Sequence, residues 1–314
     1  LADYYNGTVV NYAVTGDTSA DTLKTAKNLT ADQKKALTDA EYIVISTGGN
    51  DISRYALNFL VDFCAQNNLL ADGVTVDSIP KDLGISEYLT VFDIEKMQKF
   101  ALGNLSNSLA LLSAINTLSN QIRVNNQAYK GIIQNSIIPN INETVAAIKA
   151  VNPNAQIIVQ NVYQPVQLSP AFITSALGNS TTYTSVINTL RIELENIMAT
   201  FNTELEAAGT ENGFKVADVL TEFTAMGTEE KSASNPGHAA YFINIEQEQE
   251  KIDYHPNQKG QLAIAAEIID IIGEKHTDLG LLSDIFESLP DKANYPAAAL
   301  KTYQAAAGDI KLGD

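Results

Sequence analysis

The chain has 314 residues, of which 45% are hydrophobic, and its formal net charge is −17. This charge disfavours nucleic acid and anionic membrane surfaces as partners, because both repel an acidic protein. The single cysteine, Cys64, cannot form an internal disulfide and is expected in the core. No apolar run reaches about 18 residues, so no transmembrane helix is predicted. The three histidines are far apart, and no cluster has the spacing of metal ligands.

The N-terminus reads as the end of an element. Residues 1–7 are typical of a last helical turn closed by a glycine, and the chain has neither an initiator Met nor a signal peptide there. We therefore expect the complete protein to have a segment before Leu1, so this end gives no information on targeting.

Four β-rich runs alternate with helical patterns along the chain. The expected strands cover residues 8–14, 42–47, 156–163 and 213–219. The second run is apolar throughout, which is typical of a strand buried on both faces. Strands that alternate with helices predict a parallel sheet covered by helices on both sides.

The helical patterns lie between and after these runs. Asp17, Thr18 or Ser19 can cap a helix that we expect to reach about Leu37. Further helices are predicted over 93–150, with an interruption near Gly131, over 181–209 and over 257–275. Two segments lack clear periodicity: residues 66–92, interpreted as a loop or cap beside the site or as a surface excursion, and residues 281–314, interpreted as a linker or tail. The remaining residues, 1–280, are expected to form one domain.

Two loops follow predicted strands and carry residues suited to binding an oxygen. Gly16 follows the first strand and Asn50 follows the second. Ligands of open parallel sheets bind beyond the carboxyl ends of the strands. The backbone N–H of Gly16 and the amide of Asn50 could therefore form an oxyanion hole. The alternative is structural: Gly16 and Gly48-Gly49 as turn residues, and Asn50-Asp51 as the cap of the next helix.

A late motif supplies a candidate base. His255 precedes Pro256, which disfavours helix at His255 and allows a helix to begin just afterwards. The imidazole is thus expected on a loop at a helix N-terminus. Asp253 can accept from the ring N–H and orient it, as the acid of a catalytic triad does. His238 and His276 lack such a context and are expected on the surface or in loops.

At these residues the sequence resembles the GDSL, or SGNH, hydrolases, a family of esterases, lipases and acylhydrolases. Residues 11–18 are similar to the family's second motif, a glycine that donates to the oxyanion. Gly48-Gly49-Asn50-Asp51 matches the Gly-x-Asn-Asp motif, and Asp253-Tyr254-His255-Pro256 is similar to the last motif. The resemblance covers about residues 1–275.

The resemblance implies a three-layer α/β/α fold with a parallel, flavodoxin-like sheet, and hydrolysis of a carboxylic ester. It implies that His255 is the base, that Asp253 orients it, and that Gly16 and Asn50 form the oxyanion hole. It implies no metal or organic cofactor.

Two departures from the family pattern stand out. The acid and base are spaced Asp-x-His instead of Asp-x-x-His, with Ile252 at the earlier position. In addition, the chain contains no Gly-Asp-Ser nucleophile loop, which family order would place before Leu1. Thr18 or Ser19 is the alternative nucleophile, but Gly16 lies 34 residues before Asn50, the separation of one strand–helix–strand unit rather than two. We favour a helix cap there, with the nucleophile upstream and the 314-residue fragment inactive.

The same argument predicts a missing strand. In the family's sheet the nucleophile strand is central, between the strands expected at 8–14 and 42–47. We therefore expect a gap or a substitute pairing between these two runs.

The C-terminus carries a weaker resemblance. Residues 308–314 resemble the start of a dockerin, the calcium-binding module that anchors enzymes to cellulosomes. This implies a secreted bacterial enzyme, a cohesin on a scaffoldin as partner, and an acetylated plant polysaccharide as substrate; otherwise a lipid or a simple ester is equally suitable. The alternative function is a non-enzymatic carbohydrate-binding or scaffold-associated module on the same fold.

Overall fold

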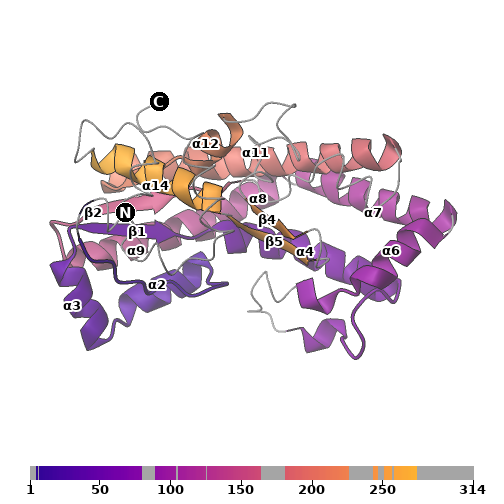
Figure 1. The fold of residues 1–314 in the computed structure, drawn as a ribbon, viewed down its shortest axis with the longest axis horizontal. Coiled ribbons are helices and arrows are strands. Elements are labelled where there is room, and N and C mark those ends of the chain that lie inside the picture. The colour runs from indigo at the N-terminus through magenta and orange to yellow at the C-terminus, as the bar shows by residue number, and fades with distance from the viewer. Residues whose placement is uncertain are drawn as a thin grey trace, which may run out of the picture.

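A computed structural model of the chain describes residues 5, 7–79, 89–103, 105–124, 126–163, 181–225, 243–246, 251–256 and 258–273. The tail predicted at 281–314 lies outside these residues. In Figure 1 the central sheet occupies one end of an elongated molecule, and α4, α7 and α11 extend from it towards α6.

Three parallel strands form the central sheet in the order β1-β2-β3: β1 (Tyr42–Ser46), β2 (Gln156–Gln160) and β3 (Lys215–Ala217). Val44 of β1 faces Ile158 of β2 in the register. Each strand lies within a run predicted from its β-branched and apolar residues, so these three predictions are confirmed, although β2 and β3 end earlier than expected.

The helices account for most of the described chain. Their bounds are α2 (Ser19–Lys27), α3 (Ala31–Asp39), α4 (Gly49–Gln66), α6 (Ile94–Gly103), α7 (Leu105–Val124), α8 (Asn126–Ile132), α9 (Ile138–Val151), α11 (Thr181–Asn212), α12 (Val219–Ala225) and α14 (Gln258–Ile272). Two short 3₁₀ turns are η1 (Val76–Ser78) and η2 (Leu89–Val91). A π-helical segment, η3 (Ile133–Ile137), joins α8 to α9, which confirms the interruption predicted near Gly131.

Apolar side chains bury one face of the sheet and, at β2 and β3, the other face as well. On one face, Ile45, Ile157 and Val159 belong to the main core, which also contains residues of α9 and α11 such as Ile141 and Phe201. On the other face, Ile158 and Ala217 pack against Ile268 of α14. Helices therefore cover the sheet from both sides, and the predicted three-layer α/β/α architecture is confirmed.

The prediction of a strand at residues 8–14 is wrong. This segment has no strand pairing, and several of its apolar side chains are exposed, with Val9 67% and Val14 61% accessible. The Asn11 side chain accepts from the Ala13 N–H at 2.9 Å, a local bond that competes with a sheet ladder. A strand needs a neighbour for its backbone groups. Within the described residues β1 pairs with β2 alone. The gap or substitute pairing expected between 8–14 and 42–47 stays a prediction.

β1 is also less deeply buried than its apolar sequence predicted. Tyr42 is 40% and Val44 43% exposed, because α14 covers β2 and β3 and not this face of β1. The ring of Tyr5 stacks on Tyr42 with centroids 6.2 Å apart. The Tyr5 hydroxyl donates to the carbonyl of Gly273, just beyond α14, at 2.8 Å. The first described residue thus bridges the sheet and α14.

The single helix expected from Thr18 to Leu37 is in fact two helices. Asn28 ends α2, and its backbone and side-chain amides both donate to the Lys24 carbonyl. Thr30 begins α3 with a reciprocal capping box to Gln33. The Thr-x-x-Gln pattern in the sequence was the signal for this break.

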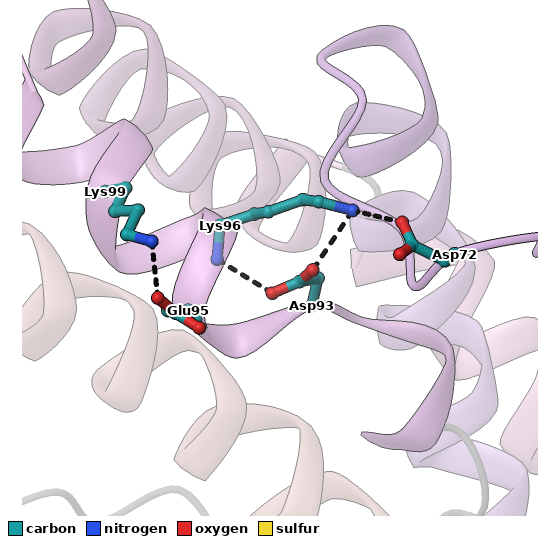
Figure 2. Close-up of polar contacts among 5 residues, drawn as sticks. All are labelled: Asp72, Asp93, Glu95, Lys96 and Lys99. Carbon is teal, nitrogen blue, oxygen red and sulfur yellow. Dashed lines mark hydrogen bonds and ion pairs between the residues drawn. The ribbon is translucent and has the colours of Figure 1, made fainter.

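The end of α4 and the segment that follows it form a small apolar cluster, which contains Cys64, Leu70 and Phe92. Cys64 is fully buried there, as predicted, and this burial raises the pKa of its thiol to about 11. Ion pairs bind the same segment from outside. Figure 2 shows Lys96 of α6 between Asp72 and Asp93, with Nζ–O distances of 2.7 and 3.1 Å. Residues 67–79 are thus an ordered attachment held to α6.

A second, antiparallel sheet was not predicted. It consists of β4 (Ile243–Glu246) and β5 (Lys251–Pro256) and is separate from the central sheet. The alternation around Ile243 and Ile245, followed by an acidic run, was the sequence signal for a hairpin.

Candidate active site

The loop after β1 is shaped by close packing. Gly48 has φ +97° and precedes α4, and a β-carbon at this position would lie 2.9 Å from the Phe201 ring and 3.3 Å from Ile137. Only glycine satisfies both the left-handed backbone and the limited space. The chain therefore turns tightly at this point, and Asn50 enters the first turn of α4.

The structure brings Gly16 and Asn50 together across 34 residues of sequence. The Asn50 amide nitrogen donates to the carbonyl of Asp17 at 2.8 Å, and Arg54 Nη2 donates to the carbonyl of Gly16 at 3.2 Å. Gly16 has φ +87°, so its peptide takes an orientation that other residues rarely adopt. Gly16, Asp17 and Asn50 are half-buried, which leaves the turn within reach of a ligand.

Asp51 also connects the turn at Gly16 to the start of α4, through Ser19. Its carboxylate accepts the Ser19 backbone N–H and the Ser19 hydroxyl, both at 2.8 Å. Asn140 of α9 donates to the Ser19 oxygen at 3.0 Å. Asp51 therefore binds Ser19, the first residue of α2, and so joins the starts of α2 and α4. The alternative that Asn50-Asp51 caps α4 is wrong, because the cap of α4 is Gly48, which makes no side-chain bond.

Neither hydroxyl of this turn is placed as a nucleophile. Thr18 caps α2: its hydroxyl donates to Asp21 Oδ2 at 2.6 Å and accepts from the Asp21 N–H. Ser19 is 1% exposed, and its proton is directed to Asp51. The helix-cap interpretation of these residues is therefore confirmed.

The electrostatics around the turn combine positive helix ends with several carboxylates. The N-termini of α2 and α4 converge there, and each carries a partial positive charge. Burial raises the pKa of Asp51, and burial followed by the nearby Asp21 raises that of Asp17. Hydrogen bonds from Thr18 lower the pKa of Asp21. The Arg54 guanidinium stabilises the charge of all three carboxylates.

The candidate base and acid lie on β5. Asp253 and His255 belong to this strand, and Pro256 is its last residue, two positions before α14 begins. The predicted loop position of His255 is wrong, because the extended backbone favoured before proline continues the pairing with β4. The prediction that a helix follows at once is confirmed. The side chains of Asp253 and His255 lie outside the description, as do His238 and His276 entirely.

A cavity of about 490 Å³ lies elsewhere, at the amino ends of β1 and β2. Its wall includes Asn152, whose amide nitrogen donates to the carbonyls of Leu37 and Ala40, both at 2.8 Å. This side chain holds the start of the sheet together. Ligands of parallel sheets bind at the opposite, carboxyl ends, where Gly16 and Asn50 lie.

The supporting residues of the site were missed from the sequence. Nothing in the spacing of Ser19, Asp51 and Asn140 indicates that they meet, and only the run Asn50-Asp51 was a signal for Asp51.

Within the described ranges, no group of three or more His, Cys, Asp or Glu could hold a metal ion. No helix in the described part of the chain is long and apolar enough to span a membrane.

Comparison with known proteins gives one family and two structures. A profile of the GDSL-like lipase/acylhydrolase family matches residues 1–263. The crystal structure of phospholipase A1 from Streptomyces albidoflavus NA297 is 12% identical with a TM-score of 0.45. That of an extracellular lipase from Streptomyces rimosus is 18% identical with a TM-score of 0.42. Each alignment covers 83% of this chain and 79% of the other. No curated protein matches the chain significantly.

Proposed function

Because the chain belongs to the GDSL-like lipase/acylhydrolase family, which acts on esters, we propose that it hydrolyses a carboxylic ester through a serine, a base and an oxyanion hole. Gly16 N–H and the Asn50 amide bind the oxyanion, His255 is the base, and Asp253 orients its ring. Because the Thr18 and Ser19 hydroxyls donate to Asp21 and Asp51, we propose that the serine is a residue other than these two.

The meeting of Gly16 and Asn50 carries the proposal. An amide nitrogen has two hydrogens, and the bond to the Asp17 carbonyl uses one of them. That bond fixes the plane of the amide, so the second N–H has a defined direction. The proposal takes this second N–H, next to the carboxyl end of β1, and the N–H of Gly16 as the two donors that an oxyanion requires.

The chemistry proceeds in two halves. The serine oxygen adds to the acyl carbonyl while His255 takes its proton, and the carbonyl oxygen becomes an oxyanion held by Gly16 and Asn50. His255 then gives the proton to the leaving alcohol, and an acyl-enzyme remains. Water attacks the acyl-enzyme with His255 again as base, which releases the acid and restores the serine.

We propose acetyl esters of plant polysaccharide as the substrate, and secretion with a cohesin-bearing scaffoldin as the setting. This choice comes from the resemblance of residues 308–314 to a dockerin, and those residues lie outside the described part of the structure. Esters of lipids or simple alcohols are the competing substrates, and the assay below separates them.

The test is hydrolysis by the full-length protein that contains this chain. We expect release of p-nitrophenol from p-nitrophenyl acetate, and faster release of acetate from acetylated xylan than of fatty acid from a long-chain ester. His255→Ala should lower kcat by about 10³-fold or more, since the base is lost. The matched control is His276→Ala, which removes an imidazole without the Asp-x-His-Pro context and should leave kcat unchanged.

Two results would contradict the proposal. The first is hydrolysis that survives His255→Ala. The second is a folded full-length protein that hydrolyses none of these esters; if it still binds xylan, the non-enzymatic carbohydrate-binding module becomes the better account.

A further inference from the structure

We propose that Asp51 is a positioning residue: its carboxylate binds the first residue of α2 and so fixes the Gly16 turn against the Asn50 amide. This inference rests on the proposed function and adds to it a residue that does not touch the substrate.

The geometry gives Asp51 a role that no other described side chain shares. Asp51 and Asn50 are adjacent in the first turn of α4, so their backbones move together. Asn50 holds the Asp17 carbonyl from one side, and Asp51 holds the Ser19 N–H and hydroxyl from the other. Two neighbouring residues of α4 thus bind both ends of the three-residue segment 17–19.

A third element supports the same contact. Asn140 of α9 donates to the Ser19 oxygen at 3.0 Å, while the Ser19 hydroxyl donates to Asp51, so the serine oxygen has partners on both sides. Ser19 is 1% exposed, and water is therefore a poor substitute for either partner. The α2 N-terminus thus has one arrangement relative to α4 and α9.

This arrangement matters for catalysis because an oxyanion hole works only with fixed donors. A shift of about 1 Å in a catalytic group can cost about 10²-fold in rate. Gly16 lies three residues before Ser19. Arg54, one turn after Asn50 on α4, donates to the Gly16 carbonyl. When Asp51 is lost, the turn keeps its bonds to Asn50 and Arg54 but loses the anchor at the start of α2.

The experiment compares Asp51→Ala and Asp51→Asn with wild type in the full-length protein. We expect Asp51→Ala to lower kcat about 10- to 100-fold with KM changed less than about threefold, because the donors act mainly on the transition state. Asp51→Asn keeps one acceptor oxygen for the Ser19 N–H, so its kcat should lie between the other two. Asp62→Asn is the matched control, because it neutralises an exposed carboxylate of the same helix and should leave kcat unchanged.

A second readout does not depend on activity. In wild type the Ser19 amide is bonded to a carboxylate and should be protected from hydrogen exchange. Asp51→Ala should speed that exchange about tenfold or more and shift the NMR signals of the Gly16 amide and the Asn50 side-chain amide. If Asp51→Ala does not fold, Asp51→Asn carries both measurements.

The outcomes separate this inference from the proposed function. Folded Asp51 variants with wild-type kcat and an equally protected Ser19 amide would overturn the positioning role while ester hydrolysis stands. A wild-type protein without hydrolysis would overturn the proposed function, and the exchange and NMR measurements would still decide whether Asp51 fixes the turn.

Discussion

The two halves of the proposed site are held in different ways. The donor half, with Gly16 and Asn50, rests on helix N-termini, a buried serine and the main core. The base half, with His255, is part of a short two-stranded sheet whose neighbour in the chain is α14. Two strands alone are marginally stable in water, so β5 depends on what packs against it.

The donor half therefore has more packing and hydrogen-bond support than the base half. Donors that are fixed before the substrate binds need no rearrangement as the oxyanion forms. The base takes a proton from one oxygen and gives it to another. The short strand that carries His255 must therefore be held in place, and α14 is the element that follows it. We therefore expect mutations near Gly48 to act through stability, and mutations on α14 to reveal how the base half is supported.

The largest effect should come from Gly48→Ala, which attacks the support of the donor half. A methyl group at this position combines a left-handed backbone with overlap against Phe201. We expect a loss of about 2–5 kcal/mol in the free energy of unfolding, measured by urea denaturation.

Gly73→Ala is the control for the Gly48 variant. Gly73 also has a positive φ, +80°, but a β-carbon there would meet nothing within 4 Å. It should cost about 1 kcal/mol from backbone strain alone. Equal losses in the two variants would show that the contact with Phe201 does not restrict the turn.

A smaller, pH-dependent effect is expected on α14. Burial first, and then the carboxylates of Glu222, Asp270 and Asp218, raise the pKa of Glu267 from 4.5 to about 7. The folded state therefore holds a proton that the unfolded state releases, so stability is greatest below pH 4.5 and falls as the pH rises to 7. Glu267→Gln should add roughly 1–2 kcal/mol at pH 8, since solvent screens this half-buried group, and almost nothing at pH 4.5.

Unfolding measured at pH 8 and at pH 4.5 tests this sign. A gain of the same size at both values would mean that the substitution acts through packing. A loss at pH 8 would mean that ionised Glu267 makes a favourable contact, such as its bond from the Asp218 backbone. Either result would weaken the view that α14 carries an electrostatic penalty beside the base half.

The sequence predicted those parts of the molecule that depend on local pattern. The strands around Val44, Ile158 and Val216 and the helix after Pro256 follow from apolar periodicity and turn residues. Gly16 and Asn50 were paired in advance on the carboxyl-end rule for parallel strands, and the structure brings the Gly16 turn to Asn50 although no strand forms at 8–14.

The predictions that were wrong concern residues whose structure depends on partners far away in the sequence. Residues 8–14 have the composition of a strand, but a strand forms only where a neighbour accepts its backbone bonds. Asp51 resembles a cap for its own helix, and only the three-dimensional structure shows that it binds the first residue of α2 instead. His255 lies in a strand because β4 folds back and pairs with β5, with Ile245 opposite Ile252.

A crystal structure of the full-length protein with a covalently bound phosphonate ester would test the central claim most directly. The phosphonyl oxygen mimics the oxyanion, and we expect it about 3 Å from both the Gly16 nitrogen and the Asn50 amide nitrogen, with the His255 ring beside the reacting atom. A phosphonyl oxygen that contacts neither donor, or a His255 ring on another face of the molecule, would contradict the account.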